Sequence, residues 1–235
     1  MNSFQYVWLT WASAFLAVFF LIYFLSPRQR STMLVAGLAT MPFGLTEPLF
    51  VPEYWDPPSL FDLAQRTGFD IESLIFTFAI GGVAVVMYDR LTGRQSVVVG
   101  STGRSQRRHR LHTLALLTPG VTFIVLSALS WNPIYSAIVA MVAGAAAAVL
   151  CRPDLLSKTL IGGLLFAGYY ALFMVGLVIT APGYIEQVWN LADLSGVVVF
   201  AIPLEELLFG LAFGLYWANI YEHLSWRRPL HHNVK

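Results

Sequence analysis

The sequence predicts an all-α, polytopic membrane protein with seven transmembrane helices. Of the 235 residues, 57% are hydrophobic and only 11% are charged, whereas soluble domains carry about 25% charged residues. Stretches without Asp, Glu, Lys or Arg cover residues 1–27, 31–46, 111–151 and 159–185. A membrane-spanning helix needs about 20 predominantly apolar residues. The composition therefore excludes an ordinary soluble domain.

Seven helices are expected where the apolar stretches are divided by charged or turn-forming residues. The stretch 111–151 is long enough for two helices, with "SWNP" (130–133) as the turn between them. The first helix is not expected to be a cleaved signal, because "MNSFQYVW" has no basic segment. The expected helices cover residues 4–25, 32–50, 70–89, 112–129, 133–151, 159–180 and 195–223.

The basic residues predict the orientation of the chain. Thirteen of the fourteen Lys and Arg residues follow the first, third, fifth or seventh expected helix, and only Arg66 lies on the other side. Basic residues collect on the cytoplasmic side of membrane proteins. We therefore expect an integral protein of the cell membrane with its N-terminus outside and its C-terminus in the cytoplasm.

No cofactor, metal or nucleic acid is expected from the motifs. The segment "GSTGRSQRRHR" (100–110) lacks the spacing of a phosphate-binding loop, and its arginines are better explained as a topology signal. The five histidines, including His231 and His232, form no recognisable metal-binding pattern. Cys151 is the single cysteine, so no internal disulfide is expected.

The chain resembles itself at an offset of 133 residues. Residues 71–91 align without a gap onto residues 204–224, and seven of the 21 pairs are identical. Upstream, "PEYWDP" (52–57) echoes "IEQVWNL" (185–191). The identical pairs include Glu72 with Glu205, Phe76 with Phe209, Gly81 with Gly214 and Tyr88 with Tyr221.

This offset predicts a 3+1+3 parallel repeat within a single membrane domain, residues 1–235. Residues 1–91 form the first three-helix repeat, 92–130 a basic cytoplasmic loop and linker helix, and 131–235 the second repeat. Parallel repeats relate by an axis along the membrane normal, and their sites form where they face each other. Glu72 and Glu205 are therefore expected at one depth, on opposite sides of a shared crevice.

Two adjacent acids, Glu205 and Glu206, lie in the apolar run "FAIPLEELLFGLAFG" (200–214). An ionised side chain inside a membrane is costly, so such residues are functional candidates by default. Pro203 is expected to kink the last helix just before them. Two neighbouring carboxyl groups discourage double ionisation, which retains a proton that could be donated to a carbon–carbon double bond. Aromatic faces could shelter the resulting carbocation.

The motif "IPLEELLF" (202–209) resembles the Pro-x-Glu-Glu motif of the lycopene cyclase domain family. This is the heterodimer-type, or fungal and archaeal type, lycopene β-cyclase, whose three-helix units are separate subunits or, as expected here, fused in one chain. The resemblance implies a non-redox, proton-initiated isomerase that closes the ψ end group of lycopene into a β-ionone ring without a cofactor. The first unit reads Asp70-Ile71-Glu72-Ser73 and lacks the proline and one acid.

Candidate site residues follow from the resemblance and the repeat together. The catalytic candidates are Glu205, Glu206 and Glu72. Glu47, in "TEPLF" (46–50), is a further acid near the expected crevice. A carotenoid end group is apolar, so we expect an aromatic slot between the third and seventh helices that is open to lipid. The candidate substrate contacts are Phe209, Phe76, Glu47, Pro203, Trp189 and Trp55.

Several alternatives share these features. Another membrane isoprenoid or terpene cyclase, or a carotenoid hydratase, would use the same acid. A 3+1+3 parallel repeat also fits a sugar transporter of the SWEET type, and a non-catalytic carotenoid-binding protein needs no acid at all. Prenyl transfer is less expected, because no D-D-x-x-D pattern is present. The expected partners are a lipid-soluble carotenoid or isoprenoid and membrane lipid, with a second copy of the chain or other carotenoid-pathway enzymes as further candidates.

Overall fold

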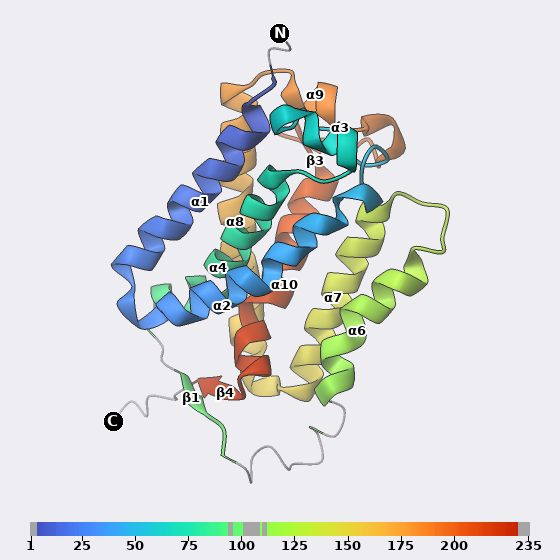
Figure 1. Cartoon of the computed structure of the whole chain (residues 1–235). Helices are drawn as coiled ribbons and strands as arrows, with labels where there is room; N and C mark the ends of the chain where they lie inside the picture. The colour runs from blue at the N-terminus through green and yellow to red at the C-terminus, as the bar shows by residue number, and fades with distance from the viewer. Residues whose placement is uncertain (1–3, 94–95, 101–108, 110–111, 230–235) are drawn as a thin grey trace.

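The computed structural model describes residues 4–93, 96–100, 109 and 112–229 and is 77% helical. Most of the basic segment 100–110, together with His231 and His232, lies outside the described residues. The long helices are α1 (Val7–Leu25), α2 (Arg30–Thr40), α4 (Ile71–Thr92), α6 (His112–Leu126), α7 (Pro133–Cys151), α8 (Leu156–Thr180) and α10 (Leu204–Leu224) (Figure 1).

Short elements connect the long helices. Two are single-turn α-helices, α3 (Leu63–Thr67) and α9 (Tyr184–Val188). The 3-10 helices are η1 (Pro27–Gln29), η2 (Met41–Leu49), η3 (Leu60–Asp62), η5 (Pro153–Leu155) and η6 (Leu191–Asp193). Two antiparallel pairs of strands complete the described chain: β1 (Ser96–Val98) with β4 (Arg227–Pro229), and β2 (Val198–Val199) with β3 (Ile202–Pro203).

The second expected helix differs from the structure. It was expected over residues 32–50, but α2 ends at Thr40 and the chain continues as the 3-10 helix η2. Pro42 and Pro48 lie in η2. Proline has no N–H and its ring collides with the preceding turn, so a regular α-helix does not continue through this segment.

The last expected helix also begins later than predicted. It was expected from residue 195, but α10 begins at Leu204, and the β2–β3 hairpin precedes it. The predicted kink at Pro203 is wrong, because this residue directly precedes the helix with φ −56° and ψ 139°. At that place the missing N–H costs no helical hydrogen bond. Glu205 and Glu206 consequently lie in the first turn of α10, at the positive end of its dipole.

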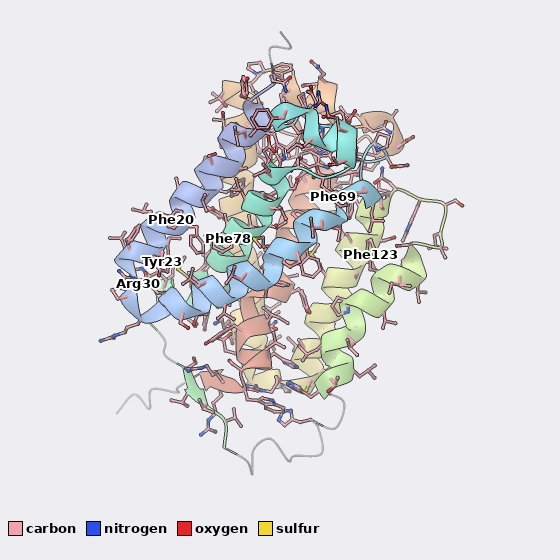
Figure 2. All side chains as sticks on the ribbon, in the orientation of Figure 1. Phe20, Tyr23, Arg30, Phe69, Phe78 and Phe123 are labelled. Carbon is pink, nitrogen blue, oxygen red and sulfur yellow. The ribbon has the colours of Figure 1, made fainter. Side chains whose placement is uncertain are left out.

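The helices and the surface are compatible with a membrane location. Among the described residues, α1, α4, α7 and the segment Pro153–Thr180 are long and apolar enough to cross a bilayer, and α6 is a shorter apolar helix. Large apolar side chains also cover the outside: Leu150 is 79% exposed and Ile124 is 74% exposed. Figure 2 labels Phe20 on α1 among these outer side chains, and it is 43% exposed. Exposed apolar surface on this scale is typical of contact with lipid or a partner.

Of the seven long helices, α4 and α10 lie at the centre. Each packs against two neighbours from its own unit. α4 packs against α1 and α2, whereas α10 packs against α7 and α8, and α6 packs on α7 (Figure 1). Gly81 permits the close approach of α4 to α2, because a side chain there would collide with Thr40. Gly214 does the same for α10 and α8, where an added Cβ would lie 2.8 Å from Phe166.

The ends of the molecule differ in chemistry. At the end where α4 and α10 finish, the buried Lys158 ammonium contacts the carboxylates of Asp89 and Glu222, each at 2.6 Å. The turn between α1 and α2 is held by Arg30, whose Nε donates to the Tyr23 carbonyl at 3.0 Å (Figure 2). At the opposite end, the acidic first turns of α4 and α10 meet the loops that carry α3 and α9 (Figure 1). That second end contains the candidate site.

Candidate active site

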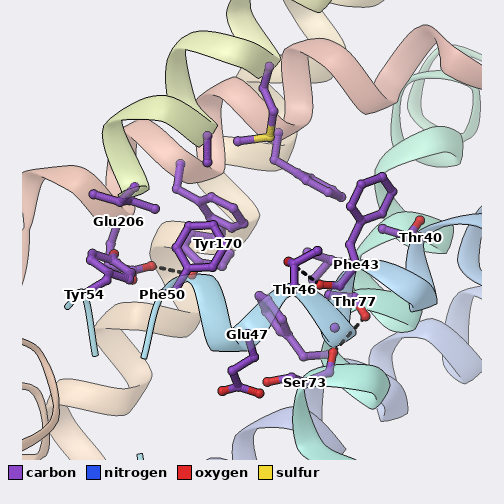
Figure 3. Close-up of a pocket in the computed structure, with 18 of the residues that line it drawn as sticks. Thr40, Phe43, Thr46, Glu47, Phe50, Tyr54, Ser73, Thr77, Tyr170 and Glu206 are labelled. Atoms are coloured by element: carbon purple, nitrogen blue, oxygen red, sulfur yellow. Dashed lines mark hydrogen bonds between the residues drawn. The ribbon is translucent and has the colours of Figure 1, made fainter. Parts of the chain in front are cut away.

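A cavity of about 510 Å³ lies between α1, η2, α4, α6, α7, α8 and α10. This volume is within the range of small-molecule binding sites. Its walls are mainly aromatic and aliphatic, and two carboxyl groups line it, those of Glu47 and Glu206 (Figure 3). It is therefore an apolar chamber with two acids in its walls.

Aromatic rings from α4 and α10 form part of the cavity wall. Phe76 of α4 and Phe209 of α10 line the cavity, where the sequence placed them. Tyr170 of α8 lies between them, with its ring centroid 6.3 Å from Phe76 and 5.7 Å from Phe209. Phe15 adds a further ring, 5.1 Å from Phe76. An apolar group in the cavity would thus be surrounded by aromatic faces.

The cavity reaches the outer surface between η2 and α6. Phe43 of η2 and Leu117 of α6 both line it, yet they are 55% and 57% exposed. Neighbouring surface side chains are also apolar, among them Leu114 and Val121 of α6. The opening therefore lies in the apolar part of the surface.

Glu206 is the most strongly hydrogen-bonded of the cavity's acids. Its side chain is buried, and the Tyr170 hydroxyl donates to Oε2 at 2.5 Å. The Tyr54 hydroxyl donates to Oε1, which also accepts from the Trp189 indole N–H at 2.8 Å. Figure 3 shows Tyr54, Tyr170 and Glu206 gathered in one part of the cavity. Three donors from three segments thus converge on one carboxyl group.

Local structure explains how these donors reach Glu206. Gly210 lies one helical turn after Glu206 on α10, and an added Cβ there would be 2.8 Å from the Tyr170 ring. Glycine therefore lets Tyr170 lie against α10. Burial, followed by the charge of Glu206, raises the pKa of the Tyr54 hydroxyl well above its ordinary value. Tyr54 consequently keeps its proton and serves as a donor.

Glu205 and Glu72 are buried but do not line the cavity, so they do not face each other across it as expected. Each instead holds the loop before its helix. Oε1 of Glu205 accepts from the Ser195 N–H at 2.8 Å, and Oε1 of Glu72 accepts from the Leu60 N–H at 2.7 Å. Glu205 also accepts from the Tyr135 hydroxyl at 2.8 Å.

Glu47 occupies a different environment in the same cavity. It is buried, and within the described part of the chain neither of its carboxyl oxygens has a hydrogen-bond partner. Ser73 and Asp70 are polar neighbours that act on its carboxyl group, and Figure 3 shows this group beside Ser73. Ser73 is the residue that aligns with Glu206 at the offset of 133. The first unit therefore places an acid from η2 near the position where the second unit has Glu206.

Trp55 and Trp189, the tryptophans of the upstream echo, meet in the structure. Their backbones form an antiparallel β-bridge, and their ring centroids are 5.4 Å apart. Both line the cavity, whereas Pro203 does not. Of the candidate substrate contacts, Phe209, Phe76, Glu47, Trp189 and Trp55 therefore reach the cavity.

Two side chains that donate hydrogen bonds to Glu206 were not singled out from the sequence. Tyr54 directly precedes Trp55 in the echoed segment, so the repeat offered a signal for it. Tyr170 lies within a long apolar helix and carries no local signal. A cluster of potential metal ligands was also missed. The ligand atoms of His109, His112 and Cys151 lie within 4.8 Å of one another. The cluster lies near the end of α10 that is remote from Glu206, since Trp226 packs against both histidines.

Comparisons with known proteins agree with the motif. The model of the family described as lycopene cyclase matches residues 132–224. No curated protein and no solved structure matches the chain. The matched segment contains α7 to α10 and hence Glu205, Glu206, Tyr170 and Trp189, whereas Glu47, Glu72 and Tyr54 lie outside it. The match over residues 132–224 therefore supports a domain of the lycopene cyclase family in this part of the chain.

Proposed function

We propose that the protein is an integral membrane carotenoid cyclase that closes the ψ end group of lycopene into a β-ionone ring by acid catalysis. The observation that carries this proposal is the Glu206 carboxyl group. It faces an aromatic cavity, accepts hydrogen bonds from three buried donors, and lies in the segment that the lycopene cyclase family model matches.

The three donors suit an acid that must protonate an alkene. A carbon–carbon double bond is a very weak base, so its proton donor must leave a well-stabilised conjugate base. Tyr54, Tyr170 and Trp189 are aimed at the carboxylate that forms when Glu206 gives up its proton. Donors that are already in place stabilise this developing charge without reorganisation.

The proposed reaction leaves the atomic composition of the substrate unchanged, because one proton is added to it and one proton is lost from it. The Glu206 proton forms a C–H bond at the terminal double bond and leaves a carbocation. The electrons of a second double bond attack this cation and form the ring C–C bond. Loss of a ring proton to the Glu206 carboxylate then restores a double bond and the acid. The rings of Phe76, Phe209 and Tyr170 would face the cation, and the product is an isomer of the substrate.

The other acids have supporting roles in this proposal. Glu205 and Glu72 are positioning residues, because each carboxylate holds the backbone of a loop next to the cavity. Glu47 lines the cavity without a donor, so its neutral form is favoured and it offers the substrate a polar but uncharged wall. Trp55 keeps Trp189 in place through their ring contact and β-bridge.

We further infer that the seven long helices, with α2 extended by η2, cross the membrane as a 3+1+3 repeat, with the N-terminus outside. α4 and α10 begin 133 residues apart (204 minus 71), which is the offset of the sequence repeat. Each also packs on the two preceding long helices of its own unit. Lys158 contacts both Asp89 and Glu222, which align in the repeat. The carotenoid would enter from lipid through the opening between η2 and α6.

Expression in a lycopene-accumulating bacterium, followed by chromatography and mass spectrometry of the pigments, tests the proposal. A cyclase produces cyclised pigment with the mass of lycopene. A product heavier by one water would assign a hydratase instead. Unchanged lycopene, with the protein folded in the membrane, would count against any enzyme of this substrate. A sugar transporter is disfavoured because rings, rather than amides and hydroxyls, dominate the cavity.

A further inference from the structure

We propose that the chain holds a tetrahedral divalent metal ion, Zn²⁺, through His109, His112 and Cys151. His112 is the first residue of α6, His109 precedes it by three residues, and Cys151 is the last residue of α7. His223, in the last turn of α10, lies beside them. Glu206 and His223 are 17 residues apart on one helix, about 25 Å, so this site is separate from the cavity acids.

The distances between the candidate ligand atoms fit a zinc site. His109 Nδ1 lies 3.5 Å from Cys151 Sγ, and His112 Nδ1 lies 3.6 Å from the same sulfur. Zn²⁺ binds nitrogen at about 2.0–2.1 Å and sulfur at about 2.3 Å, so ligand atoms around a tetrahedral ion are about 3.3–3.7 Å apart. Two of the three distances between the ligand atoms therefore already have the length that the ion requires.

The ligand set also selects the class of metal. Imidazole and thiolate are the ligands that Zn²⁺ takes in proteins, whereas Mg²⁺ and Ca²⁺ prefer oxygen. Binding replaces the Cys151 thiol proton by the metal and releases that proton to water. Three protein ligands leave a fourth position, which a water molecule can fill.

His223 gives an independent reason to expect a ligand here. Its side chain is completely buried, and neither ring nitrogen has a hydrogen-bond partner within the described part of the chain. A buried polar group without a partner is destabilising, because it has lost its hydrogen bonds to water without replacement. Its ring is stacked on His112, with centroids 4.2 Å apart and planes within 1°. A water molecule on the metal would lie next to His223 and could satisfy it.

The surroundings hold the ligands in place and balance the charge. His112 lies between two rings, because Trp226 stacks on its other side with a centroid distance of 4.0 Å. Among the described residues, Arg152 is a nearby cation, and its guanidinium pairs with Asp154 at 2.9 and 2.6 Å. This pairing offsets the charge of Arg152. The stacked rings limit the rotation of the His112 imidazole.

A bound ion would fasten the start of α6 to the end of α7. α6 supplies one wall of the cavity, and Leu116, one turn after His112, belongs to that wall. The ion would thus fix one side of the opening between η2 and α6. Metal binding itself does not depend on the cyclase proposal, because its ligands lie outside the cavity lining.

The test is the zinc content of the full chain, purified in detergent without a histidine tag and measured by elemental mass spectrometry. We expect about one Zn²⁺ per chain, and a fall to background in Cys151→Ser and His112→Ala. The matched control is His231→Ala/His232→Ala, which removes two other histidines and should retain the ion. Wild-type protein without zinc after incubation with Zn²⁺, or full zinc content in Cys151→Ser, would overturn the proposal.

A second measurement uses the wild-type protein alone and so does not depend on a variant that folds. Cobalt added to the chelator-treated protein should produce a thiolate-to-cobalt charge-transfer absorption, because Cys151 is the only cysteine. Zn²⁺ should abolish this band by displacement. Cobalt that binds without the thiolate band would contradict the proposed ligands.

Discussion

The two acids that line the cavity, Glu206 and Glu47, differ in what surrounds them. Glu206 accepts hydrogen bonds from Tyr54, Tyr170 and Trp189, while Glu47 has no partner for either oxygen within the described residues. Both side chains are buried, at 4% and 5% exposure. Burial alone therefore does not distinguish them, and the difference lies in the donors.

This difference indicates how one cavity can use two carboxyl groups for separate purposes. Three donors stabilise the carboxylate of Glu206, so it can release a proton to a weak base. Glu47 lacks such donors, and releasing its proton would leave an unpaired charge in an apolar wall. We therefore assign proton donation to Glu206, and the comparison can be tested one side chain at a time.

Glu206→Gln should have the largest effect. Glutamine keeps the shape and the acceptor oxygen but has no proton to donate, so cyclised pigment should fall by at least about 10²-fold. The measurement is pigment chromatography at equal amounts of folded membrane protein. Glu205→Gln is the matched control and should retain most activity, because a glutamine oxygen can still accept from Ser195. Normal conversion by Glu206→Gln would remove this residue from the mechanism.

Tyr170→Phe should have the second largest effect. It removes one donor from the Glu206 carboxylate, and a hydrogen bond to a charged group contributes about 1.5–3 kcal/mol, equivalent to about 10- to 100-fold in rate. Tyr169→Phe is the control, because the Tyr169 hydroxyl has no hydrogen-bond partner in the described structure. Equal losses in both variants would show that ring packing, rather than the donor, matters at position 170.

Gly210→Ala should have an intermediate effect through geometry. The added methyl group would lie 2.8 Å from the Tyr170 ring and should displace it from Glu206. Overpacking of this kind costs about 1–3 kcal/mol, so both conversion and the thermal stability of the detergent-solubilised protein should fall. Gly168→Ala on α8 is the control, since nothing lies within 4 Å of its added Cβ. A fully active, stable Gly210→Ala variant would contradict the described approach of α8 to α10.

Glu47→Gln should have the smallest effect. A neutral glutamine resembles the neutral carboxyl group that we infer for Glu47, so conversion should fall by less than about tenfold, the change that 1.4 kcal/mol would produce. The same pigment assay measures it, at equal protein in the membrane. A loss as severe as that of Glu206→Gln would assign the proton chemistry to the pair instead.

Much of the fold could be predicted because apolar stretches and prolines act locally. Each of the seven long helices lies within a few residues of its predicted place except at two boundaries. Pro42 and Pro48 turn the end of the second helix into η2. Pro203 was expected inside the last helix, but the β2–β3 hairpin places it just outside. Strands that are only two residues long are too short to show a periodic pattern in the sequence.

The candidate site was less predictable, because its selection depends on which neighbours meet in space. The sequence singled out Glu205 and Glu206 as a pair, but adjacent residues of a helix point about 100° apart, and only Glu206 lines the cavity. Tyr170 comes from a helix with no polar pattern, and its hydroxyl has meaning only beside Glu206. His109, His112 and Cys151 likewise meet only because α6 and α7 pack together.

The most direct test of proton donation is the reaction in D₂O. Purified protein in lipid vesicles would convert lycopene, and mass spectrometry would measure the deuterium in the product. The Glu206 carboxyl group exchanges with solvent before substrate is added, so the first ring formed by each enzyme molecule should carry one deuterium atom in place of hydrogen, with no other change in composition. A cyclised product without deuterium would contradict acid initiation by an exchangeable carboxyl group.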